Sequence, residues 1–235
     1  MTSINQIKRE LRQKGDPVRA EHSRRFFKTG KGQYGEGDVF LGLSVPEMRE
    51  IAKKYKDLEL SEIEKLLRSK IHEERFTAIE ILNFKYKDAL APARSKIVNF
   101  YLKYKEFVNN WDLVDDSAPY ILGNWLLDKD TKILHKLAGS KSLWDRRIAI
   151  VATFAFIKND RFKDTLEISE KLLDDDEDLI HKAVGWMLRE VGKKDIKLLE
   201  KFLAKHASHM PRTALRHAIE RFPESKREKY LKISG

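Results

Sequence analysis

The chain has 235 residues, with 47 lysines and arginines against 37 aspartates and glutamates and a formal net charge of +10. It contains no cysteine, which excludes disulfides, thiolate metal sites and a cysteine nucleophile. The length suits one large domain or a repeat array, and the excess of positive charge favours a polyanion such as nucleic acid as partner.

The N-terminal stretch, MTSINQIKRELRQKGDP, lacks the apolar core of a signal peptide. No stretch of the sequence approaches the roughly eighteen apolar residues that a membrane-spanning helix needs. We therefore expect a cytoplasmic protein without a membrane partner.

A glycine-rich segment follows at 29–47, TGKGQYGEGDVFLGLSVPE. We expect a loop over 29–43 between N-terminal helices, and then a helix capped by Ser44 with Pro46 in its first turn. The GKG in this segment is not followed by the Gly-Lys-Ser/Thr of a phosphate-binding P-loop, so we expect no nucleotide site here.

Apolar residues recur at helical spacing through the next part of the chain. The successive sets are Leu58, Ile63, Leu66 and Leu67, then Phe76, Ile79, Ile81 and Leu82, then Ile97, Phe100, Tyr101 and Tyr104. No alternating run bounded by hairpin turns indicates a sheet. The fold class is therefore predicted to be all-α.

Four helical segments resemble one another, each opening with a basic residue that small and aliphatic residues follow. They are RFTAIEIL (75–82), RIAIVATF (147–154), KAVGWMLRE (182–190) and RTALRHAIE (212–220). Their spacing suits two-helix repeats stacked into a solenoid, an α-α superhelix, as a single domain over 1–235. The repeated basic residues are predicted to line its concave face, where they would suit a duplex.

The stretch NNWDLVDD at 109–116 combines a tryptophan with three acids. Trp111 and Asp115 are four residues apart, so on a helix they share a face. Asn110 is a plausible N-cap, and near a helix N-terminus Asp112 and Asp116 are expected to complement the helix dipole.

Two further candidates lie later in the chain. In LWDRRIAIV, only one of Arg146 and Arg147 can face a given surface, because neighbours on a helix point about 100° apart. In AVGWMLRE, Trp186 lies in a largely apolar helix, where packing in the core is the ordinary role of a tryptophan.

Taken together, these stretches resemble the DNA alkylation repair proteins, the HEAT-like-repeat DNA glycosylases. The resemblance lies in YGEGDVFLGLSVPEMREIAK (34–53), EERFTAIEIL (73–82), NNWDLVDDSAPYILG (109–123), SLWDRRIAIVATF (142–154) and IHKAVGWMLREVG (180–192). It covers most of the chain in the family's order and spacing. The glycine-rich loop departs from some relatives, in which this segment is shorter.

The resemblance implies hydrolysis of the N-glycosidic bond of N3- or N7-alkylated purines in duplex DNA, as part of base excision repair. Carried over by position, Asp115 is the carboxylate that stabilises an oxocarbenium-like transition state. Trp111 and Trp186 are implied to pack on the sugar–phosphate backbone, and Arg147 to hold a phosphate beside the lesion. The resemblance also implies that the base is not drawn into a deep pocket.

Other basic residues are expected to bind phosphates without reading sequence. They are Lys182, Arg189, Arg212 and Arg75, with Lys28 and Lys31 as a clamp in or beside the glycine-rich loop. His206 and His209 match no established zinc spacing, so we expect neither a metal nor a cofactor. We expect a monomer that associates with the nucleoid through DNA.

Two alternatives remain open. One is a HEAT-like-repeat protein that binds damaged or branched DNA without cutting it. The other is a protein-interaction solenoid, against which the strong positive charge argues. Salt-dependent DNA affinity would separate this last class from the other two.

Overall fold

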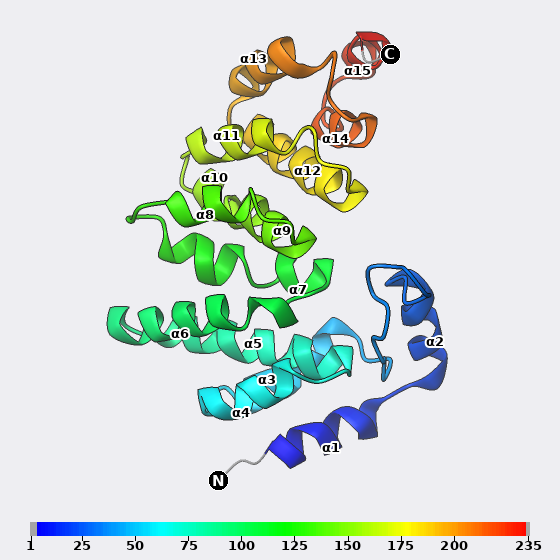
Figure 1. Cartoon of the computed structure of the whole chain (residues 1–235), viewed down its shortest axis with the longest axis vertical. Coiled ribbons are helices and arrows are strands. Elements are labelled where there is room, and N and C mark those ends of the chain that lie inside the picture. Colours follow the sequence, from blue (N-terminus) through cyan, green and yellow to red (C-terminus); the bar gives the residue numbers. More distant parts are fainter. Residues whose placement is uncertain (1–3, 234–235) are drawn as a thin grey trace. The chain divides into compact units, whose positions relative to one another are not determined.

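The computed structural model describes residues 4–233 (Figure 1). Regular structure in that range is helical, apart from one parallel bridge between Val39 and Ile71. The prediction of an all-α helical-repeat protein is therefore confirmed. Among these described residues, no helix is long and apolar enough to cross a membrane.

The contacts within the chain divide it into two compact units, Met1–Ser117 and Ala118–Gly235, and each is described by itself. In a repeat array each repeat contacts mainly its neighbours, so compact units also arise inside one domain. That the chain forms a single domain stays a prediction.

The first unit is built from short helices around one long, buried helix, α5. Its elements are α1 (Ile4–Lys14), α2 (Pro17–Phe26), α3 (Val45–Lys54), α4 (Leu60–Leu67), α5 (His72–Asp88), α6 (Ala91–Lys103), a 3₁₀ turn (Lys105–Phe107) and α7 (Trp111–Asp115). α5 packs against α1, α3, α4 and α6, which leaves Phe76, Ile79 and Leu82 fully buried. The three apolar sets expected to be helical correspond to α4, α5 and α6, except that Leu58 lies before α4 and Tyr104 is the C-cap of α6.

The second unit has α12 at its centre. Its elements are a π-helical turn (Pro119–Gly123), α8 (Lys132–Leu137), α9 (Leu143–Ala152), α10 (Phe154–Lys158), α11 (Lys163–Lys171), α12 (Asp178–Lys194), α13 (Ile196–His206), α14 (Arg212–Ala218) and α15 (Glu224–Ile233). α12 packs against α9, α11, α13 and α14 (Figure 1). Gly185 makes the approach of α14 possible, since a Cβ there would lie 2.5 Å from the carbonyl oxygen of Ala214.

The glycine-rich segment lies between α2 and α3 and consists of turns. α3 begins as predicted, because the carboxylate of Glu47 accepts hydrogen bonds from the backbone N–H and the hydroxyl of Ser44 at 2.7 and 2.6 Å. Pro46 lies in the first turn of this helix. Gly42 has a φ of +85° and packs so closely on the start of α2 that a Cβ would lie 2.1 Å from the carbonyl oxygen of Asp16.

Candidate active site

α7 carries the first two predicted site residues. The helix begins after Asn110, whose side-chain oxygen accepts a hydrogen bond from the backbone N–H of Trp111 at 2.8 Å, so the predicted N-cap is confirmed. Trp111 and Asp115 stand one turn apart on this helix and are both half-buried. An indole and a carboxylate thus share one face of α7.

Trp111 belongs to an aromatic cluster, which we define as Phe26, Phe27, Phe40, His72 and Trp111. The ring of Phe27 stacks on Trp111, with centroids 5.2 Å apart and planes 19° apart, and also contacts Phe40 and His72 at 5.1 and 4.8 Å. Phe26 meets Trp111 edge-on at 5.6 Å and is 57% exposed. The cluster therefore runs from the interior of the first unit to its surface.

Beneath the cluster lies a buried ion network, which we define as Asp38, His72, Arg75 and Asp112. Nε2 of His72 lies 2.7 Å from Oδ2 of Asp112, and Nδ1 lies 3.4 Å from Oδ2 of Asp38. Arg75 donates to the same Asp38 oxygen at 2.7 Å. The network joins three segments of the first unit: the glycine-rich loop, the start of α5 and α7.

The surroundings of this network shift the pKa of two of its members. Burial alone would lower the pKa of His72, but the charge and hydrogen bond of Asp112, together with Asp38, raise it to about 9. For Asp38, burial opposes ionisation, yet the hydrogen bond from His72 and the charge of Arg75 leave its pKa below the ordinary value. Both groups are therefore charged near neutral pH.

His72 and Arg75 are part of HEER, residues 72–75, all four of which are at most 3% exposed. The carboxylate of Glu73 accepts backbone hydrogen bonds from Leu41 and Gly42, the latter at 2.7 Å. Glu74 forms ion pairs with two basic residues of α1, Lys8 and Arg12. The start of α5 thus holds the end of the glycine-rich loop, α1 and α7 at once.

Of the other two acids of the NNWDLVDD stretch, Asp112 lies in the first turn of α7 as predicted, but Asp116 is the C-cap of this short helix, so its predicted role at a helix N-terminus is wrong. Both acids bind side chains. Asp112 binds His72, and Asp116 pairs with Arg49 at 2.9 Å. The backbone oxygen of Asp116 also accepts a hydrogen bond from Asn83 at 2.6 Å. Burial, with the nearby charges of Asp112 and Asp115, raises the pKa of Asp116, although Arg49 opposes this.

The second unit holds the other two predicted site residues. Trp186 is half-buried on α12, and its ring meets that of Phe154 at 5.7 Å. Arg147 is 5% exposed and donates a hydrogen bond to the carbonyl oxygen of Leu179, at the start of α12, at 2.6 Å. Its neighbour Arg146 points elsewhere and pairs with Asp175.

The basic residues expected to bind phosphates in the second unit differ in exposure. Lys182 is exposed and pairs with Asp178 at 2.8 Å, one turn back on α12. Arg212 is exposed and donates to the carbonyl oxygen of Leu231 at 2.5 Å. Arg189 is less exposed than these two: it is half-buried and forms ion pairs with Glu190 and Glu220.

In the first unit, Lys28 and Lys31 are exposed in the loop region, as a contact with DNA requires. Arg75 differs from them. It is 3% exposed, and its guanidinium donates to Asp38 and to the carbonyl oxygen of Ser69. The guanidinium of Arg75 neutralises the nearly buried carboxylate of Asp38. We therefore give Arg75 a structural role and do not carry it into the proposed DNA surface.

The sequence signature of the DNA alkylation repair enzyme family matches residues 7–222. The chain belongs to this family. Family membership gives the protein a role in the repair of alkylation damage, with DNA as its substrate. No curated protein sequence matches the chain.

A solved structure described as a "Predicted DNA alkylation repair enzyme from Enterococcus faecalis" is similar to the chain, with a TM-score of 0.69. The two sequences are 17% identical, and the similarity covers 90% of this chain and 98% of the other. At this identity the likeness extends to the fold alone.

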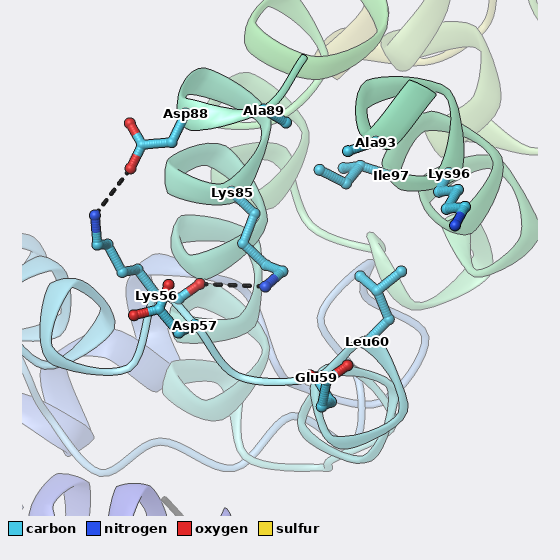
Figure 2. Close-up of a pocket in the computed structure, with 10 residues that line it drawn as sticks. All are labelled: Lys56, Asp57, Glu59, Leu60, Lys85, Asp88, Ala89, Ala93, Lys96 and Ile97. Carbon is cyan, nitrogen blue, oxygen red and sulfur yellow. Dashed lines mark hydrogen bonds and ion pairs between the residues drawn. The ribbon is translucent and has the colours of Figure 1, made fainter. Parts of the chain in front are cut away.

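The first unit of the protein also has a cavity of about 320 Å³ (Figure 2). Three lysines and three acids line it, among them Lys56 and Asp88, which pair at 3.0 Å. Lys85, on its wall, lies about 20 Å along α5 from His72 at a rise of 1.5 Å per residue. Its balanced charge and its distance from α7 leave this cavity outside the candidate site.

Histidines elsewhere form no recognisable metal site. His206 is buried, with its Nδ1 3.3 Å from Nε2 of His209. Over residues 4–233 no group of three or more histidine, cysteine, aspartate or glutamate side chains is placed to hold a metal ion.

Reasoning from the sequence missed His72, Asp38 and the partners of HEER. A signal was present, since four consecutive charged or titratable residues come directly before the mainly apolar run FTAIEIL, residues 76–82. The partners of His72 could not be identified from it, because Asp38 and Asp112 lie 34 and 40 residues away along the chain.

Proposed function

We propose that the protein is a DNA glycosylase that removes cationic N3- and N7-alkylated purines from duplex DNA. The observation that carries the proposal is the presence of Trp111 and Asp115 on one face of α7, held by a buried ion network. Membership of the alkylation repair family supports it. A half-buried indole beside a carboxylate also suits a cationic nucleotide better than an ordinary phosphate backbone.

The chemistry needs a fixed negative charge more than a strong acid. An alkylated purine is positively charged, so the bond from C1′ breaks with both electrons going to the ring nitrogen and the base leaves neutral. Positive charge then grows on the deoxyribose, and water adds to C1′ and releases a proton. The carboxylate of Asp115 is proposed to stabilise that charge and to orient the water.

Trp111 and Trp186 are proposed to pack their faces on the sugar–phosphate backbone and to attract the cationic nucleotide. As the family resemblance implies, Arg147 is proposed to hold a phosphate beside the lesion. Its hydrogen bond to Leu179 fixes it to the start of α12.

Further phosphate contacts are proposed for exposed cations. These are Lys28, Lys31, Lys182 and Arg212, with a smaller part for the paired Arg189. Such contacts position the protein on DNA and carry no sequence information. We propose that the protein binds duplex DNA as a monomer and needs no metal.

The test is the release of free bases from methylated duplex DNA, measured by chromatography, for the native protein and for Asp115→Asn. The substitution keeps the side-chain shape but removes the charge. We expect the native protein to free methylpurines, and the variant to bind the duplex while freeing few. A native protein that binds methylated DNA and releases nothing would replace the proposal with the alternative of a binding protein without catalysis.

A further inference from the structure

His72 is the buried titratable group that the proposed chemistry leaves unused. It is 2% exposed, and its ring contacts those of Phe27 and Phe40 at centroid distances of 4.8 and 4.7 Å. Each of its ring nitrogens faces a carboxylate oxygen. A histidine held in this way cannot touch DNA, so any role in the reaction must pass through its neighbours.

The arrangement favours the doubly protonated ring. A neutral imidazole has one N–H, which could donate to Asp112, while Nδ1 accepted from Arg75 at 3.4 Å. That state would leave two buried carboxylates, Asp38 and Asp112, facing one cation. With an imidazolium the network has two charges of each sign, which a buried site requires because unpaired charge there is costly.

The contacts of His72 reach α7 at Asp112 and, through Phe27, at Trp111. Nε2 of His72 binds Asp112, in the first turn of that helix, at 2.7 Å. The ring also contacts Phe27, which stacks on the indole of Trp111. α7 has only five residues, too few to be stable alone, so tertiary contacts must fix it and with it Asp115.

We propose that His72, as an imidazolium held between Asp38 and Asp112, is a positioning residue that fixes α7 and thereby sets the geometry of Trp111 and Asp115 for glycosidic hydrolysis. This inference rests on the proposed function. The charged groups that face the ring are Asp38 from the glycine-rich loop, Asp112 from α7 and Arg75 from α5, while Phe27 and Phe40 carry no charge.

The inference predicts an alkaline limit to activity. When His72 loses its proton, the network keeps two carboxylates and one cation, and the hold on α7 weakens. Because the pKa of His72 is about 9, the rate of base release should fall as the pH rises through that value. Replacing Asp112 by asparagine removes a charge that raises this pKa, so the fall should move to lower pH.

The experiment measures single-turnover base release from methylated duplex DNA between pH 6.5 and 9.5. It compares the native protein with His72→Gln, Asp112→Asn and the control His209→Gln. DNA affinity and circular dichroism are measured in parallel. Misplacement of a reacting group by about 1 Å costs on the order of 100-fold. We expect His72→Gln to lose roughly 10- to 100-fold at pH 7.5, to bind DNA normally and to lack the alkaline fall. The control should behave as the native protein does.

A folded His72→Gln variant with native rates and a native pH profile would overturn the inference, as would an Asp112→Asn variant whose alkaline fall stays in place. If His72→Gln does not fold, the profile of Asp112→Asn carries the test. Nitrogen-15 spectra of histidine-labelled native protein give a readout that does not depend on activity. Two protonated ring nitrogens on His72 at pH 7.5 support the inference, and a single protonated ring nitrogen contradicts it.

A native protein that frees no base would refute the proposed function alone, since these spectra still decide the state of His72.

Discussion

α7 and α12 hold the two tryptophans that we propose to contact DNA, and they do so in different ways. α12 has 17 residues and an apolar stripe of its own, so it is fixed along its length by packing, and Trp186 adds one aromatic contact. α7 has five residues and depends on its cap, on the aromatic cluster and on the buried ion network. The position of the proposed catalytic carboxylate, that of Asp115, therefore depends on the groups that hold this short helix.

The largest effect on stability is expected where that surrounding network loses a charge. Arg75→Met leaves Asp38 buried without its closest cation, and it should lower the free energy of unfolding by about 3–5 kcal/mol. Arg212→Met, at the corresponding start of a repeat segment but exposed, should change it by less than about 0.5 kcal/mol. Urea denaturation of both variants checks this, and equal losses would contradict the contrast between a buried and an exposed repeat cation.

The stability of the protein should also depend on pH through His72. Its pKa is about 9 in the folded protein against an ordinary value of 6.5, so the folded state binds the proton more tightly. Its contribution is therefore complete below pH 6.5 and is lost as the pH rises through 9. Urea denaturation at intervals from pH 6.5 to 9.5 should show this decline in the native protein and a smaller one in His72→Gln. Parallel declines would rule out His72 as its source.

Removal of each tryptophan should sharpen the comparison of α7 and α12. Trp111→Ala loses contacts with two rings, Phe26 and Phe27, whereas Trp186→Ala loses one, with Phe154. Since an aromatic pair contributes about 0.5–1.5 kcal/mol beyond burial, Trp111→Ala should be the less stable variant by about 1 kcal/mol. Thermal unfolding of the two variants measures the difference, and a less stable Trp186→Ala would reverse our view of which helix depends more on its surroundings.

The smallest expected effect concerns an exposed cation of α12. Lys182→Ala should weaken binding to any duplex alike and reduce the slope of log affinity against log salt concentration by about 1. Lys56→Ala is the matched control, because Lys56 lies at the cavity in Figure 2 and pairs with Asp88. An unchanged slope for Lys182→Ala would remove this residue from the proposed DNA surface.

The features that could be predicted from the sequence are those that local chemistry determines. Ser44 and Pro46 indicated the start of α3, Asn110 indicated that of α7, and apolar spacing indicated α4 to α6. The shared face of Trp111 and Asp115 also follows from their spacing alone.

What could not be predicted depends on partners far away in the chain. The repeated cation is buried at Arg75 and Arg147 but exposed at Lys182 and Arg212, although the four segments look alike in sequence. A helical pattern gives the face on which a side chain lies, but not whether a carboxylate from a distant loop covers it. The carboxylate of Asp38 covers Arg75 in this way, and the spacing of the repeats does not indicate that contact.

The central claim is that the charge of Asp115 stabilises positive charge on the deoxyribose. The most direct test is the single-turnover rate on a duplex with one N7-methylguanine, comparing Asp115→Asn with Asp116→Asn. The two variants lose the same charge at adjacent positions, but Asp116 pairs with Arg49 and is not proposed to face DNA. We predict a loss of about 10²- to 10³-fold for Asp115→Asn and a much smaller loss for Asp116→Asn, with DNA affinity kept in both. Equal rates for the two variants would contradict the account.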